Sequence, residues 1–141
     1  MVFNTTYKDD KIDSRISEIT GKPYSFIQSL KMGGTGSHRM IIENASHHFE
    51  PCLNKVADTQ YCNLEIRPLG VLVHINKGLG NYTWPIPYYQ LVIYKSKTLS
   101  IHANGMFVKL KLDKNFQRNH KFFTRLENIK LAQTEAHNFI H

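Results

Sequence analysis

The dipeptide Asn104-Gly105 is the feature that most constrains how this chain folds. Both central positions of a type I′ turn need a positive φ, and Asn followed by Gly meets that need at the least steric cost. A period of two is typical of strands with one buried face. The pattern therefore predicts an antiparallel hairpin over residues 99–112 with a two-residue turn. Its apolar positions are Leu99, Ile101 and Ala103 before the turn, and Met106, Val108, Leu110 and Leu112 after it.

Further strands are expected upstream of this hairpin. Alternating apolar residues predict strands over 64–67 and 71–75, and β-branched and aromatic residues favour a strand over 88–94. A shorter strand is expected over 39–43, whereas residues 49–60 fit no single element. Clusters rich in glycine, asparagine, lysine or serine predict turns at 32–37, 78–81 and 95–97.

The apolar period changes from two to between three and four after Phe116. Steps of three and four residues mark one face of an amphipathic helix. We expect Phe122 or Phe123, together with Leu126 and Ile129, to be buried against the sheet. The fold class is therefore predicted as α+β, with a bent antiparallel sheet or partly open barrel packed by a C-terminal α-helix.

The length of 141 residues predicts a single domain over 1–141. Residues 1–22 are interpreted as either a loose N-terminal arm or a short helix, because Ile12, Ile16 and Ile19 have helical spacing and Gly21 would end a helix. No apolar run approaches the roughly 20 residues of a membrane span. A membrane-spanning protein is therefore not expected.

Part of this pattern resembles a known family. The Trp84-Pro85-Ile86 step that leads into the 88–94 segment, the Asn104-Gly105 hairpin and the final amphipathic helix are similar to small bacterial pleckstrin-homology-like (PH-like) domains. The resemblance covers about residues 61–137. It implies a noncatalytic module that binds a lipid, a peptide or another domain, and it implies no catalytic residue.

The net charge of +7 is unevenly distributed along the chain. Residues 1–60 hold seven basic and seven acidic side chains, whereas residues 61–141 hold eleven basic and four acidic ones. One electropositive half favours anionic partners, although a solvated face that only confers solubility gives the same composition.

The candidate anion-binding residues lie around the hairpin and the start of the final helix. Lysines on the polar face of a strand extend into water and attract anions at little cost. Nearby aromatic side chains are candidates for stacking on bases or entering a lipid interface, unless they fill the core. The basic candidates are Lys95, Lys97, Lys109, Lys111, Lys114 and Arg118, and the aromatic candidates are Tyr82 and Trp84.

Catalytic and metal-binding motifs give weaker signals. The eight histidines form no recognised zinc spacing, so a site built from Cys62, His74 and His102 competes with the interpretation that these histidines lie on the surface. No nucleophile, histidine and carboxylate are selected as a set. The glycine-rich stretch 33–37 lacks the lysine of a phosphate-binding loop and is interpreted as a turn. No metal or cofactor is therefore expected.

Two cysteines and an N-terminus without an apolar stretch predict a cytoplasmic protein with free thiols. The expected function is a noncatalytic binding module for an acidic protein segment or an anionic lipid headgroup. Nonspecific nucleic-acid binding through the same basic strip is the alternative, and a small hydrolase or metal-dependent enzyme is the third reading. The sequence does not indicate an oligomeric state.

Overall fold

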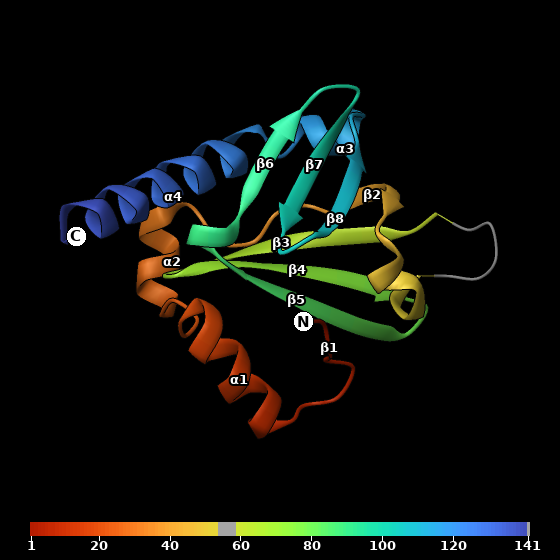
Figure 1. Cartoon of the computed structure of the whole chain (residues 1–141), viewed down its shortest axis with the longest axis horizontal. Coiled ribbons are helices and arrows are strands. Elements are labelled where there is room, and N and C mark those ends of the chain that lie inside the picture. Colours follow the sequence, from red (N-terminus) through yellow and green to blue (C-terminus); the bar gives the residue numbers. More distant parts are fainter. Residues whose placement is uncertain (54–58, 141) are drawn as a thin grey trace.

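The strands of the computed structural model, which describes residues 1–53 and 59–140, form one antiparallel sheet (Figure 1). The strand order is β1-β5-β4-β3-β2-β8-β7-β6, and the sheet is open at both edges. With a C-terminal helix packed on it, the fold is of the α+β class, as the sequence predicts. The strands are β1 (Phe3–Asn4), β2 (Met40–Ala45), β3 (Tyr61–Arg67), β4 (Gly70–Lys77), β5 (Gly80–Pro87), β6 (Val92–Lys95), β7 (Thr98–Ala103) and β8 (Met106–Lys111).

The predicted hairpin is confirmed. Strands β7 and β8 pair in register from Thr98↔Lys111 to Ala103↔Met106, which leaves two residues in the turn. Asn104 has a φ of 55° and Gly105 a φ of 78°, the positive values that a type I′ turn requires. Every second residue of β8 is buried, beginning with Met106, so the hairpin has one core face and one outer face.

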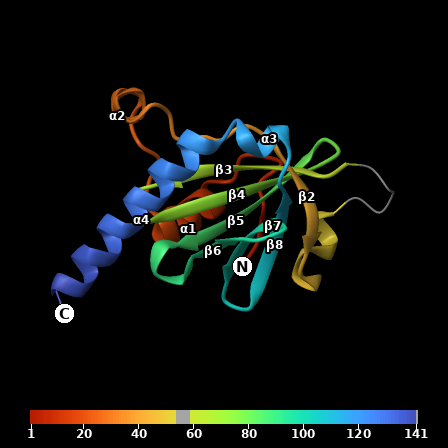
Figure 2. The same ribbon diagram turned by 90° about the horizontal axis from the view of Figure 1, so that it is seen from above.

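Strand β2 joins the two halves of the sheet. One end of β2 pairs with β3 and the other with β8, and the register shifts between Ile42 and Asn44. Such an irregularity increases the local bend of a strand. The sheet therefore folds over, and the inner faces of its two halves enclose one core (Figure 2). Trp84 packs edge-on against Phe49 in this core, with 4.9 Å between ring centroids.

The expected loop at 78–81 and strand at 88–94 are wrong in their bounds. Strand β5 occupies Gly80–Pro87, residues Tyr88–Gln90 form the short 3-10 helix η2, and β6 begins only at Val92. Pro85 and Pro87 made β5 hard to predict, because proline has no backbone N–H to donate a hydrogen bond to a neighbouring strand and is therefore unfavourable in a central strand. Beyond Thr83, however, β5 pairs only with β4, so proline is tolerated at this free edge.

The C-terminal helical region is interrupted once, between α3 (Lys114–Gln117) and α4 (His120–Ile140). The buried Asn119 side chain lies at the break and makes two hydrogen bonds to the backbone of His38, accepting from its N–H at 2.7 Å and donating to its carbonyl at 3.3 Å. After this break, Phe122, Phe123 and Leu126 are buried, as predicted, whereas Ile129 is only half-buried against the same core. Residues 131–136 of α4 are all exposed, so the helix leaves the core after its first half.

Helix α1 (Asp10–Thr20) covers the outer face of β4 and β5 (Figure 1). The Asp9 side chain caps its first turn, and Ile16 and Thr20 are buried against the sheet. Gly70 permits this close packing, because a Cβ atom there would lie 2.8 Å from the Thr20 methyl group and 2.2 Å from the Ile86 carbonyl oxygen. The other two helical segments are α2 (Phe26–Met32) and the 3-10 helix η1 (His47–Cys52).

Candidate functional site

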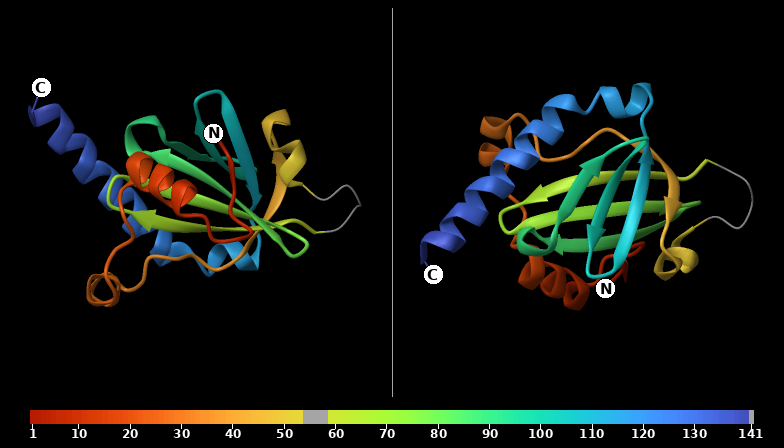
Figure 3. Two further views of the ribbon diagram at one scale, coloured as in Figure 1. Left: turned by 90° about the horizontal axis from the view of Figure 1, so that it is seen from below. Right: turned by 45° about the horizontal axis from the view of Figure 1, so that its top comes forward.

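The outer face of β6, β7 and β8 carries aromatic and basic side chains. In the described part of the chain no helix lies over this face (Figure 3). Its residues alternate with the core residues of the same strands, and the register places Val92 opposite His102 and Ser100 opposite Lys109. We define the basic–aromatic face as Tyr94, Lys97, His102, Phe107, Lys109 and Lys111.

Three rings of this face are neighbours across three adjacent strands: Tyr94 and His102 are stacked, and Phe107 is tilted by 34° relative to His102. The Tyr94 and His102 rings are nearly parallel, with centroids 5.0 Å apart, and the His102 and Phe107 centroids are 5.6 Å apart. The Lys109 ammonium lies 5.4 Å from the centroid of Phe107. Tyr94 is 51% exposed, so one aromatic surface is available to a ligand at the β6 edge of the stack.

Two of the predicted lysines meet in a shallow hollow beside these rings. Lys97 follows β6, Lys109 comes from β8, and Ser96 and Thr98 also line the hollow of about 620 Å³. Lys111 pairs with Thr98 and shares the outer face of β8 with Lys109. Glu43 lines the same hollow and partly offsets the positive charge.

The other predicted basic residues do not join this hollow. Lys95 pairs with the buried Leu99, so it belongs to the side of β6 that faces the core. Its ammonium lies 5.5 Å from the ring centroid of Phe116 in α3. Lys114 and Arg118 are exposed at the two ends of α3. The predicted set therefore divides into an outer-face group, Lys97, Lys109 and Lys111, and a group around α3.

The two predicted aromatic contacts lie elsewhere. Trp84 is 2% exposed in the core, where no base or lipid can reach it, and Tyr82 is half-buried against the same core. Both belong to β5, whose inner face carries Tyr82, Trp84 and Ile86 opposite the core residues of β4. The exposed aromatic surface beside the lysines comes instead from Tyr94, which sequence reasoning missed because its neighbours depend on the β6–β7 register.

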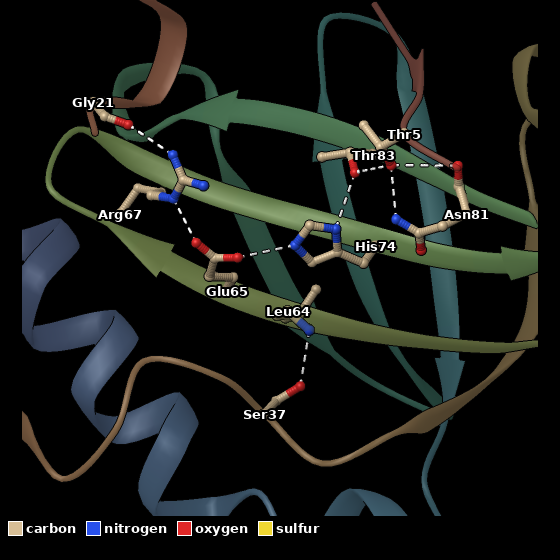
Figure 4. A network of polar contacts seen from close by, with 9 residues as sticks. All are labelled: Thr5, Gly21, Ser37, Leu64, Glu65, Arg67, His74, Asn81 and Thr83. Atoms are coloured by element: carbon tan, nitrogen blue, oxygen red, sulfur yellow. Dashed lines mark hydrogen bonds and ion pairs between the residues drawn. The ribbon is translucent and has the colours of Figure 1, made fainter. Parts of the chain in front are cut away.

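A second polar cluster lies on the outer face of β3, β4 and β5 (Figure 4). Glu65 contacts Arg67 through one carboxylate oxygen and His74 Nε2 through the other, the latter at 3.1 Å. His74 Nδ1 lies 3.0 Å from the Thr83 hydroxyl, which lies 2.7 Å from the Thr5 hydroxyl. A hydrogen-bonded chain thus runs from β3 through β4 and β5 to the N-terminal residues.

The Glu65 carboxylate holds this chain together. Burial opposes its ionisation, but the hydrogen bonds to His74 and Arg67 outweigh burial and lower the pKa of Glu65. When His74 is neutral, its Nε2–H donates to Glu65 and its Nδ1 accepts from Thr83. The order of carboxylate, imidazole and hydroxyl is that of a catalytic triad, but Thr83 is only 1% exposed and its hydroxyl is hydrogen-bonded to that of Thr5. The cluster therefore anchors the N-terminal residues to the sheet.

The residues considered for a zinc site are not brought together. Cys62 is fully buried on the inner face of β3, where burial raises the pKa of its thiol to about 12. His74 lies on the outer face of β4, and His102 lies on the outer face of β7, in the other half of the sheet. Among the described residues, no group of three or more metal-ligating side chains was found.

A larger hollow of about 830 Å³ lies between η2, α1 and α4. Its apolar lining includes Leu69, Tyr89 and Val92, and its two charged groups, Glu18 and Lys130, have opposite signs. It therefore offers no net positive charge to an anion, and the basic–aromatic face is the better candidate for the anion site.

No family model, curated protein or solved structure matches this chain. Within the described residues, none of the helices combines the length and apolar character needed to cross a membrane.

Proposed function

We propose that this chain is a noncatalytic, PH-like binding module that holds an acidic protein segment on its basic–aromatic face. The observation that carries the proposal is that Lys97, in the turn between β6 and β7, and Lys109, on β8, line one open hollow next to the Phe107 ring. The bent antiparallel sheet with its C-terminal helix supports the PH-like assignment.

The chemistry of the face suits carboxylates on an extended chain. Ammonium groups and the hydroxyls of Ser96 and Thr98 are hydrogen-bond donors for carboxylate oxygens, and charge-assisted bonds of this kind are the stronger ones. The buried, free thiols of Cys52 and Cys62 are consistent with the proposed cytoplasmic setting.

Single-stranded nucleic acid is a second candidate because of one observation, the exposed ring of Tyr94 at the end of the stack. Bases stack on such rings with little regard to sequence, and lysines neutralise the phosphates. An acidic peptide without aromatic residues needs the lysines but gains little from Tyr94. The variant Tyr94→Leu therefore separates the two ligands.

The test measures binding of a fluorescent polyglutamate peptide and of a fluorescent single-stranded oligonucleotide at increasing salt. We expect polyglutamate to bind at low salt and to dissociate as salt screens the lysines. The triple variant Lys97→Gln, Lys109→Gln, Lys111→Gln should weaken binding about tenfold, since each exposed charge contact contributes about 0.2–1 kcal/mol. Tyr94→Leu should leave polyglutamate binding unchanged.

A charge-matched control is Lys8→Gln, Lys11→Gln, Lys121→Gln, which removes the same charge from exposed positions off this face. Equal weakening by both triple variants would show attraction by net charge alone and would refute the site. A large loss of oligonucleotide binding in Tyr94→Leu, with no polyglutamate binding by the wild type, would favour the nucleic-acid function.

A further inference from the structure

Helix α2 has its apolar residues on the side that faces solvent. Phe26, Ile27 and Leu30 are 78%, 65% and 64% exposed, and no residue of α2 is buried. At about 100° per residue these three side chains share one face of the helix, and Met32 lies on the opposite side. Met32 is half-buried and packs against the core. This polarity is the reverse of that of an ordinary surface helix, which turns its apolar stripe inward.

Local caps define α2, and a residue near each end packs against the core. Ser25 and Gln28 form a capping box at its start, and Gly33, with a φ of 81°, ends it. Tyr24 and Met32 pack against the core just before the helix and at its end. Helix α2 lies at the periphery of the molecule, away from the sheet (Figures 2 and 3). The exposed residues are therefore displayed by a folded element with anchors at both ends.

The charged residues in α2 and in the segments that flank it along the chain are all basic. The sequence from Gly21 to Ile42 contains no acidic residue, and Lys22 and Lys31, on either side of the apolar residues, are exposed. The Arg125 guanidinium of α4 lies against Gly33, where a Cβ atom would be 3.6 Å from Nη1. An apolar protrusion bordered by cations complements a surface with anionic headgroups outside and hydrocarbon beneath.

We propose that α2 inserts Phe26, Ile27 and Leu30 into the interface of an anionic phospholipid membrane, with Lys22 and Lys31 at the headgroups. A membrane accepts a small convex protrusion, whereas a stable protein interface needs about 800 Å² from each partner. Three side chains on a seven-residue helix fall short of such an area. This inference goes beyond the proposed function, because it concerns a different surface and a different ligand.

The test is co-sedimentation with vesicles of phosphatidylcholine alone and of phosphatidylcholine mixed with phosphatidylserine. We expect the wild type to bind the mixed vesicles, and Phe26→Gln, Ile27→Gln, Leu30→Gln to reduce that binding at least tenfold. The matched control is Leu79→Gln, Tyr89→Gln, Leu131→Gln, which removes three other exposed apolar side chains and should bind like the wild type. Lys22→Gln with Lys31→Gln should remove the preference for phosphatidylserine.

An inserted side chain also gives a spectroscopic signature. Trp84, the one native tryptophan, is already buried, so its emission should not respond to vesicles. Phe26→Trp should therefore produce a blue shift on vesicle addition that Leu79→Trp does not. Both variants keep the core intact, because positions 26 and 79 are exposed.

Several outcomes would overturn the inference. The wild type could fail to bind mixed vesicles, or both triple variants could bind equally well. Concentration-dependent dimers that only the α2 triple variant abolishes, without vesicle binding, would assign the helix to a protein interface instead. Polyglutamate binding should be unchanged in the α2 triple variant, so the failure of this inference is distinguishable from that of the proposed function.

Discussion

The two outer faces of the sheet differ in what covers them. On β3, β4 and β5 the outer face is partly covered by α1, which packs on β4 and β5, and its polar groups are paired with one another from Arg67 to Thr5. On β6, β7 and β8 the outer face has no covering helix in the described chain, and its lysines extend toward solvent. The covered face satisfies its own polar groups, whereas the bare face leaves its cations available to a ligand.

The comparison shows that titratable groups alone do not mark a binding site. Glu65 and His74 form the more ordered constellation, yet their hydrogen bonds are used within the protein. Lys97 and Lys109 line an open hollow, and the proposed function requires an anion to displace water there. Sites for ligands are therefore expected where the fold leaves charge unpaired.

The largest effect on stability is expected for a substitution that disrupts the packing of α1 on the sheet. Ile16→Ala removes a side chain buried between α1 and the sheet, and it should lower the free energy of unfolding by about 2–5 kcal/mol. Tyr94→Leu on the bare face should change it by less than about 0.5 kcal/mol. Urea unfolding of both variants measures the difference. Similar losses would contradict the distinction between the two faces.

A smaller effect concerns the Glu65 network. Glu65→Gln removes charge-assisted hydrogen bonds and should cost about 1.5–3 kcal/mol at neutral pH. Since the pKa of Glu65 is lowered by folding, its ionised form stabilises the protein above its ordinary value of 4.5, and this contribution is lost as the pH falls through the folded pKa. The stability gap between wild type and variant, followed by denaturant unfolding at several pH values, should therefore close in acid. A gap that is constant with pH would refute the role assigned to the carboxylate.

The smallest expected effect is a change in polyglutamate affinity at the outer face of β6, β7 and β8. Glu43 is the acidic residue in the hollow that holds Lys97 and Lys109. Glu43→Gln should tighten polyglutamate binding by roughly twofold to fivefold, with the gain disappearing at high salt. Titration of the labelled peptide at two salt concentrations checks this. Unchanged or weaker binding at low salt would place the ligand outside the hollow.

Local sequence patterns were sufficient to predict part of this structure. Asn104-Gly105 predicted its hairpin because the turn residues and both flanking periods agree, and Leu126 was placed in the core by helical spacing. Strand β5 was missed because its prolines lie where the strand has a free edge beyond Thr83, which is a property of the assembled sheet. The edge position of β5 is not visible in its own residues.

The candidate sites were less predictable for the same reason. Lys97 and Lys109 were predicted together because they lie beside and on one hairpin, whereas the side chain of Lys95 has the core-facing orientation on β6 and contacts Phe116 of α3 instead. Contacts of the Thr5–Thr83 type join residues far apart in the sequence, and no local spacing signals them. The outward apolar face of α2 becomes significant only once Met32 is known to face the core.

The central claim is that the bare outer face of β6, β7 and β8 is the ligand surface. The most direct measurement is two-dimensional NMR of the wild-type protein during titration with polyglutamate. We predict that chemical-shift changes concentrate at Lys97, Thr98, Lys109 and Lys111, while resonances of α1 stay in place. Changes centred on α1, or spread evenly over all exposed lysines, would contradict the account.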